Sequence, residues 1–300
     1  MSPSPERERP MLTGERGLPR DRWRAKVRAH LGADFHKLSG PLLRTMIEPK
    51  QALKSVLRKF DLALVKAASL DHMLKTDADM KFLMTMSDSS CAAAILQNFP
   101  LSKSQLRQDL FVLSELQFKR GGSFVEFGAT DGVGLSNTHL MEKEFGWSGI
   151  LAEPAQSWHS QLSRNRTAAI EHECVWSKSG LSLEFNEVDD AELSTVASVA
   201  SGDAHDRQSG SRYLVKTISL DDMLDRHHAP QDIDYLSIDT EGSEYEILSA
   251  FDFGKHSFKV ITCEHNYTPA REKIFALLSR NGYTRKLEEI SGFDDWYVRQ

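Results

Sequence analysis

The stretch that decides the fold is FVEFGATDGVG, residues 124–134. Apolar residues on both sides of Glu126 predict a short buried strand, and the glycines that follow predict a loop. Gly128 and Gly132 lack a Cβ atom, so the backbone at these positions can come close to a bound ligand. A strand that leads into an acid and a glycine loop therefore indicates a site for a nucleoside-type cofactor.

The spacing of these glycines argues against a dinucleotide cofactor. The fingerprint G-x-G-x-x-G requires a glycine where this chain has Thr130. A pyrophosphate would also be repelled by Glu126 and Asp131, whereas a positively charged sulfonium compound would not. The loop therefore predicts S-adenosylmethionine as the cofactor, with Thr130 and Asp131 beside Glu126 among its contacts.

Away from this loop, short apolar runs alternate with helical or polar stretches. The runs are WSGILAEP (147–154), AAIEHECVW (168–176), DIDYLSIDTEG (232–242) and KVITCEHN (259–266). Such alternation predicts an α/β fold with a mostly parallel sheet that is covered on both faces. Two further pieces, GYTRKLEEI (282–290) and DDWYVRQ (294–300), predict an antiparallel hairpin at one side of that sheet.

The remaining cofactor contacts are expected where the next apolar runs end. In an open α/β sheet, ligands bind beyond the carboxyl ends of the strands. Glu153 ends the second run, where a carboxylate can accept hydrogen bonds from two ribose hydroxyls. Cys174 and Val175 lie near the end of the third run and are placed to flank an adenine ring.

Acidic residues gather at the ends of the last two runs. Asp239 and Glu241 follow one strand, and Glu264 and His265 follow the next. An alcohol acceptor needs a base near the methyl group, and either His265 or Asp239 can serve. Asp239, Glu241 and Glu264 together also form a possible site for Mg²⁺, because hard cations prefer oxygen ligands.

Each of these residues also has a structural interpretation. Asp239 is placed to cap the helix that begins near residue 242, and Glu241 can be a solvated acid of its first turn. His265 can be a loop histidine whose ring is satisfied by neighbours. Cys174 can be a small buried hydrophobe.

From Ser104 to Val298 the chain resembles the FkbM-type methyltransferases. The matching motifs are SQLRQDLFVL (104–113), residues 124–154, TISLDDML (217–224), YLSIDTEGSEYEIL (235–248), ITCEHN (261–266) and GFDDWYV (292–298). The resemblance implies the seven-stranded class I methyltransferase fold and an S-adenosylmethionine-dependent O-methyltransferase. The usual methyl acceptors that this resemblance implies are sugar or polyketide hydroxyls. It assigns cofactor roles to Glu126, Gly128, Gly132 and Glu153.

A long polar segment covers residues 186–213 and predicts a lid over the carboxyl edge of the sheet. We expect Leu193, Ser194 and Thr195 to contact the acceptor, a hydroxylated small molecule, together with Glu241 and His265. Two other functions stay open at this point: a non-catalytic module that binds S-adenosylmethionine for a partner, and a methyltransferase acting on protein.

The rest of the chain divides into two N-terminal segments. Residues 1–22 predict a disordered tail, residues 23–100 a helical region and residues 101–300 the methyltransferase domain. Within the helical region, we expect Met73, Met80, Met84 and Met86 to be core residues.

The composition bounds the class of protein. A net charge of −6 argues against a nucleic-acid binder, and three widely spaced cysteines argue against a disulfide scaffold. The first residues resemble no secretory signal, and no apolar run approaches the roughly 20 residues that span a membrane. We therefore expect a cytoplasmic protein with no membrane span; its oligomeric state is open.

Overall fold

The computed structural model describes residues 54, 56–59, 61–87, 90–188, 194–196 and 210–300. The chain forms two compact units, Met1–Ala67 and Ala68–Gln300. The predicted tail and Leu193 lie outside the described residues. The predicted domain boundary at residue 100 falls inside the second unit, which contains the sheet and is described below.

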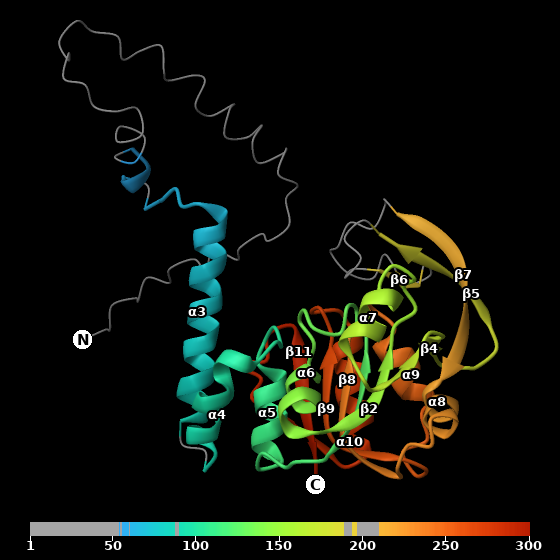
Figure 1. The fold of residues 1–300 in the computed structure, drawn as a ribbon. Coiled ribbons are helices and arrows are strands. Elements are labelled where there is room, and N and C mark those ends of the chain that lie inside the picture. Colours follow the sequence, from blue (N-terminus) through green and yellow to red (C-terminus); the bar gives the residue numbers. More distant parts are fainter. Residues whose placement is uncertain (1–53, 55, 60, 88–89, 189–193, 197–209) are drawn as a thin grey trace, which may run out of the picture. The chain divides into compact units, whose positions relative to one another are not determined.

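A seven-stranded sheet forms the centre of this unit (Figure 1). Its strands are β1 (Ser123–Phe127), β2 (Ser148–Ala152), β3 (Ala169–Glu171), β8 (Asp232–Ile238), β9 (Ser257–Glu264), β10 (Tyr283–Lys286) and β11 (Asp294–Arg299). They are arranged in the order β3-β2-β1-β8-β9-β11-β10, and the first five are parallel. Strand β11 is antiparallel to both neighbours. This confirms the predicted seven-stranded, mostly parallel class I methyltransferase fold with an antiparallel C-terminal hairpin.

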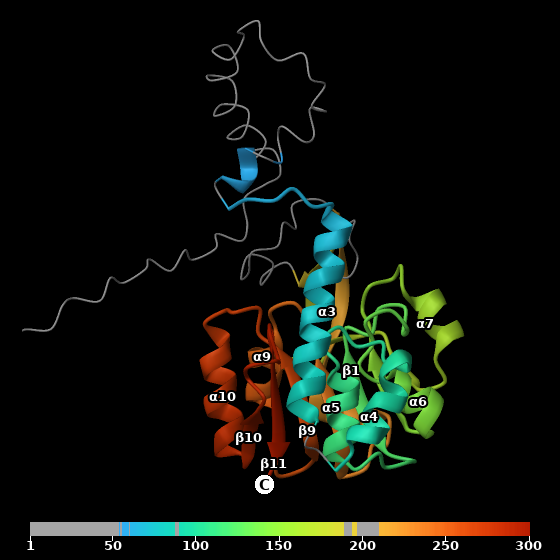
Figure 2. The same ribbon diagram turned by 90° about the vertical axis from the view of Figure 1, so that its left-hand side faces the viewer.

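Helices cover both faces of the sheet (Figures 1 and 2). They are α3 (Ala67–Met86), α4 (Ala92–Asn98), the 3₁₀ helix η2 (Phe99–Leu101), α5 (Gln108–Glu115), α6 (His139–Phe145), α7 (His159–Asn165), α8 (Leu220–Arg226), α9 (Glu244–Ala250) and α10 (Ala270–Arg280). Alternate strand residues supply two cores: Val125 packs with α8–α10, whereas Phe124 packs with α3–α7. In the described part of the chain, none of the helices combines the length and apolarity that crossing a membrane requires.

A second, four-stranded sheet extends beyond the carboxyl ends of the main strands (Figure 1). It contains β4 (Cys174–Trp176), β5 (Ser182–Glu187), β6 (Thr195–Val196) and β7 (Ser211–Ser219). Strands β5 and β7 pair antiparallel, and β6 pairs with β5. The predicted polar lid therefore belongs in part to a sheet, since β6 and the start of β7 lie within residues 186–213.

The methionines of α3 do not all enter the core. Met86 is buried, whereas Met73, Met80 and Met84 are exposed, so the expectation of four core residues is wrong for three of them. Only the C-terminal part of α3 contacts the sheet unit, where Phe82 meets the ring of Trp296 edge-on. The apolar spacing marks a helix correctly, but it does not say which face is covered.

Candidate active site

A cavity of about 260 Å³ lies at the carboxyl ends of the parallel strands. Residues at or just past the ends of β1, β2, β8 and β9 form its floor, and the second sheet forms a side wall. The wall residues are Cys174, Val175, Phe185, Ser194, Thr195 and Val196. The cavity is therefore located where the sheet order predicts a ligand site.

The cavity is strongly acidic. The described residues that line it include five acids, Glu126, Glu153, Asp239, Glu241 and Glu264. The same lining contains no Lys, Arg or His among the described residues. Five carboxyl groups around one small volume favour a ligand with positive charge and disfavour a pyrophosphate. The charge of the cavity thus fits a sulfonium compound.

Glu126 holds the glycine loop in place through its carboxylate. That carboxylate accepts hydrogen bonds from the Asn137 backbone N–H at 2.7 Å and from the Ser136 hydroxyl at 3.0 and 3.1 Å. The hydroxyl of Thr138 also donates to it. Glu126 therefore fixes the far end of the loop, which brings Asn137 to the cavity.

Arg166 is a site residue that the sequence did not reveal. Its side chain is fully buried; Nε donates to Glu142 at 2.7 Å, and Nη1 lies 3.6 Å from Glu126. The same guanidinium donates to the carbonyl oxygen of Gly132 at 3.1 Å and to the hydroxyl of Thr138 at 2.8 Å. One cation thus joins the loop to α6, but a lone arginine in a polar stretch gives no sequence signal of this role.

Two glycines of the loop make room for protein rather than for ligand. Gly128 has φ +71°, and a Cβ there would lie 2.1 Å from the carbonyl oxygen of Asp239. Gly132 has φ +78°, and a Cβ would lie 2.5 Å from Cγ of Arg166. Gly128 still lines the cavity, whereas Gly132 does not, so the expected close approach of Gly132 to the cofactor is corrected.

The neighbouring loop residues also differ in their placement. Thr130 lines the cavity, but Asp131 does not. The Asp131 carboxylate instead accepts from the backbone N–H groups of Val133 and Gly134, at 2.7 and 2.8 Å. Asp131 therefore closes the loop on itself, and its expected contact with the cofactor is corrected as well.

The carboxyl group of Glu153, which also lines the cavity, is held in a fixed orientation by the backbone. Its two oxygens accept from the backbone N–H groups of Thr130 and Ala155, each at 2.8 Å. Burial raises its pKa to about 7, although these two hydrogen bonds act in the opposite direction. Each oxygen keeps acceptor capacity for a further donor, such as a ribose hydroxyl.

Next to Glu153, the side wall is apolar. Cys174, Val175, Phe185 and Val196 are all buried. Burial, followed by the neighbouring Glu153, raises the pKa of the Cys174 thiol to about 12, so this thiol stays neutral. The wall therefore suits a flat, uncharged ring such as adenine.

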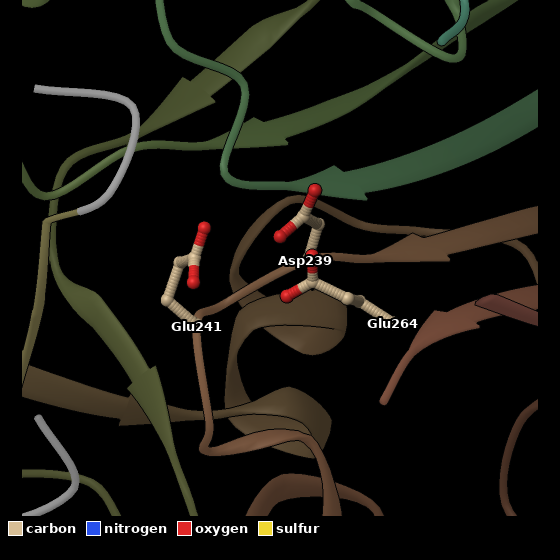
Figure 3. A group of neighbouring side chains, drawn as sticks. All are labelled: Asp239, Glu241 and Glu264. Carbon is tan, nitrogen blue, oxygen red and sulfur yellow. The ribbon is translucent and has the colours of Figure 1, made fainter. Parts of the chain in front are cut away.

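Asp239, Glu241 and Glu264 all line the cavity, and their side chains lie close together (Figure 3). One oxygen of each lies within 4.8 Å of the others. Burial, and then repulsion from Asp294, raises the pKa of Asp239 to about 7. Burial and the neighbouring Asp239 raise the pKa of Glu264 further still, and the two carboxyl groups are hydrogen-bonded.

This cluster has two chemical interpretations. In one, Glu264 keeps its proton and donates it in a hydrogen bond to the Asp239 carboxylate, which then acts as a base. In the other, a divalent cation replaces the proton, with oxygen ligands from all three residues. The raised pKa values of Asp239 and Glu264 describe the cluster without metal.

His265 lies outside the cavity. Glu264, the last residue of β9, lines the cavity, whereas His265, the first residue after the strand, does not. Its Nδ1 accepts from the Tyr267 N–H at 3.0 Å, and its Nε2 lies 3.7 Å from Asp295. Burial lowers its pKa. This placement corrects two expectations for His265, namely that it acts as the base and that it contacts the methyl acceptor.

Three described residues of the predicted lid, Ser194, Thr195 and Val196, reach the cavity. The Thr195 hydroxyl donates to the carbonyl oxygens of Thr240 and Glu241, both at 3.1 Å. Strand β6 is therefore fastened to the loop after β8, and Thr195 positions that loop.

One orphaned atom tests whether the residues fit S-adenosylmethionine. Oδ1 of Asn137 is buried and has no hydrogen-bond partner among the residues that the structure describes, whereas its Nδ2 donates to the Ser237 hydroxyl at 3.0 Å. Asn137 lines the acidic cavity, so this acceptor suits an ammonium group. With the apolar wall and Glu153, the described residues offer groups for the amino acid, adenine and ribose parts of that cofactor.

Comparison with known proteins gives matches at two levels. No curated protein matches this chain. A methyltransferase FkbM from Methylobacillus flagellatus KT is similar at 12% identity, over 69% of this chain and 60% of that one, with a TM-score of 0.38. A precorrin-6y C5,15-methyltransferase from Geobacter metallireducens GS-15 is similar at 11% identity, over 63% and 85%, with a TM-score of 0.35.

The family model is the decisive match. The methyltransferase FkbM domain matches residues 126–285, from the acid of the glycine loop to the first strand of the C-terminal hairpin. This is more than half of the chain. The chain therefore belongs to the FkbM family of S-adenosylmethionine-dependent methyltransferases.

Proposed function

We propose that the enzyme transfers a methyl group to a hydroxyl of a sugar, a glycoside or a polyketide-type small molecule. The observation that supports this best is Asp239, a cavity carboxyl group whose pKa is raised to about 7. A general base is most effective when its pKa lies near the working pH. An alcohol acceptor needs such a base, because it is a poor nucleophile while it keeps its proton.

The cofactor would occupy the part of the cavity between the glycine loop and the second sheet. S-adenosylmethionine, when bound, supplies an electrophilic methyl group. Glu153 would accept from its ribose hydroxyls, Asn137 from its ammonium group, and Cys174 and Val175 would flank its adenine. Together these contacts fix the orientation of the cofactor, which is the protein's largest contribution to a displacement reaction.

The acceptor would occupy the part beside Asp239. Glu241, Asn266 and Ser194 line the same cavity as Asp239. Carboxylate and amide oxygens accept hydrogen bonds from hydroxyl groups, so an acceptor with several hydroxyls fits this lining. Asp239 would take the proton of the reacting hydroxyl, while Glu264 holds the Asp239 carboxylate in place.

The test uses isotope-labelled methyl donor and a library of glycosides and polyketide-type alcohols, with mass spectrometry of the products. Asp239→Asn should lower kcat by about 100-fold or more and leave cofactor affinity within a few-fold. Glu246→Gln, on the exposed face of α9, is the matched control and should leave kcat unchanged. Labelled protein in place of labelled small molecules would refute the proposed acceptor class.

Metal dependence is a separate question with its own measurement. Our mechanism uses a shared proton at Asp239 and Glu264, so a chelator should leave the rate unchanged. A rate that falls with EDTA and returns with Mg²⁺ would instead assign Asp239, Glu241 and Glu264 as cation ligands.

A further inference from the structure

Helix α3 has one face attached to the sheet unit. Asp79 pairs with Arg107, with the carboxylate oxygen 2.9 Å from Nε. One turn further on, Phe82 lies edge-on to Trp296 with ring centroids 6.5 Å apart, and Met86 is buried in the same cluster. These contacts fix the C-terminal half of the helix.

The opposite face of α3 is apolar, and none of the residues that the structure describes covers it. Its exposed fractions are 44% for Leu70, 61% for Met73, 60% for Leu74, 52% for Met80 and 70% for Met84. Single exposed hydrophobic residues are ordinary, but a continuous stripe on one helix indicates an interaction surface. In Figure 2, α3 extends past the ends of the neighbouring helices.

The spacing within the stripe indicates that its partner is another helix. Leu70, Met73, Asp77, Met80 and Met84 follow one another at intervals of three and four. This is the spacing of the contact line between two helices of a coiled coil. Four of the five positions are apolar, and the polar one, Asp77, is at the centre.

The charges at the centre identify the partner helix. Asp77 pairs with Lys81 at 2.7 Å, and both side chains are more than 60% exposed on the stripe. In a parallel pair of identical helices, Asp77 would face its own copy. In an antiparallel pair, Asp77 would lie beside the partner's Lys81 and Lys81 beside the partner's Asp77. Like charges are thereby avoided, and the two-fold arrangement repeats the same ion pair twice.

The same two charges disfavour a lipid surface. Inserting the stripe into a membrane would bury Asp77 and Lys81 along with the apolar residues, and buried charges are costly.

We propose that the exposed stripe of α3 is a docking site for a second copy of this chain, in antiparallel orientation. In this dimer, Met73 of one copy packs near the partner's Met84, on both sides of the central ion pairs.

The test is charge exchange, followed by analytical ultracentrifugation over concentrations from about 1 to about 200 μM. The wild-type chain should associate reversibly. Asp77→Lys alone and Lys81→Asp alone should each weaken self-association by about 10-fold or more, because like charges then meet. An equal mixture of the two variants should associate like wild type, since opposite charges meet again. Lys75→Asp, an exposed change on the side of α3 that faces away from the stripe, is the control and should associate normally.

Several results would overturn the proposal. A wild-type chain that stays monomeric over the whole range would do so, as would an Asp77→Lys variant that associates like wild type. A mixture that stays dissociated would refute the antiparallel arrangement. Flotation of the monomer with phosphatidylcholine–phosphatidylserine vesicles would assign the stripe to lipid. Unchanged melting temperatures of the variants would exclude misfolding as the cause of their weaker self-association.

Discussion

The replacement Arg166→Gln should destabilise the enzyme by about 3–5 kcal/mol, the usual cost of breaking a buried ion pair. In the wild-type structure, Arg166 is fully buried between Glu126 and Glu142. Glutamine keeps some hydrogen-bonding capacity but removes the charge, so two buried carboxylates lose their counterion. The glycine loop should lose its order, and cofactor affinity should fall with it.

The pKa of Glu142 gives a second route to this magnitude. Burial alone would raise it, but the Thr167 N–H and the charge of Arg166 outweigh burial and lower it from 4.5 to about 2. That difference corresponds to about 3 kcal/mol, with Arg166 supplying part of it. Because the folded-state pKa is depressed, this stability is present above pH 4.5 and is lost as the pH falls toward 2.

The assay is urea unfolding followed by circular dichroism at pH 7, 5 and 3. At pH 7 the variant should also melt about 10 °C below wild type. The gap between the two proteins should shrink as Glu142 becomes protonated at low pH. Arg164→Gln, an exposed position on the same helix, is the control and should stay within about 0.5 kcal/mol of wild type. A gap below 1 kcal/mol at pH 7, or one independent of pH, would refute this account of Arg166.

Three further predictions concern single positions. Gly132→Ala should lower the free energy of unfolding in urea by about 2–4 kcal/mol, because the new Cβ would overlap Arg166. Gly180→Ala, at φ +77° with open space around it, should lower it by only about 1 kcal/mol. Equal costs for the two variants would contradict the packing argument. The rate of methyl transfer should rise with pH and level off above about 7, as Asp239 loses its proton, and a rate independent of pH between 5 and 8 would contradict its role as base. His265→Ala should lower the free energy of unfolding by about 1–3 kcal/mol, because it removes a buried acceptor, but should leave the midpoint of that pH profile unchanged; a shifted midpoint would return His265 to the reaction.

The sequence predicted the main sheet and the location of the site because both depend on local patterns. Short apolar runs between helical stretches specify parallel strands, and the carboxyl ends of such strands meet at one edge. For that reason the order of the runs was enough to group Glu153, Asp239 and Glu264 at one site. The second sheet was less predictable, because β5 and β7 are brought together across a long polar segment.

The roles of individual side chains depended on contacts between distant parts of the chain. Glu264 ends β9 and lines the cavity, whereas His265, the next residue, contacts Tyr267 and Asp295 outside it, and the sequence does not distinguish the two. The missing side chain of Gly132 predicts room for a ligand, but Arg166 fills that room from another part of the chain.

Helix α3 shows the same division between pattern and contact. Its spacing of apolar residues identified a helix, because that spacing reflects the backbone repeat. Which face of the helix was covered depended on Trp296, which lies near the C-terminal end of the sequence. Local sequence thus determined the elements and the edge at which their acids gather. Tertiary packing alone decided which charges are neutralised, which surfaces stay exposed and which carboxyl groups have a raised pKa, because each of these depends on neighbours that are remote in the sequence.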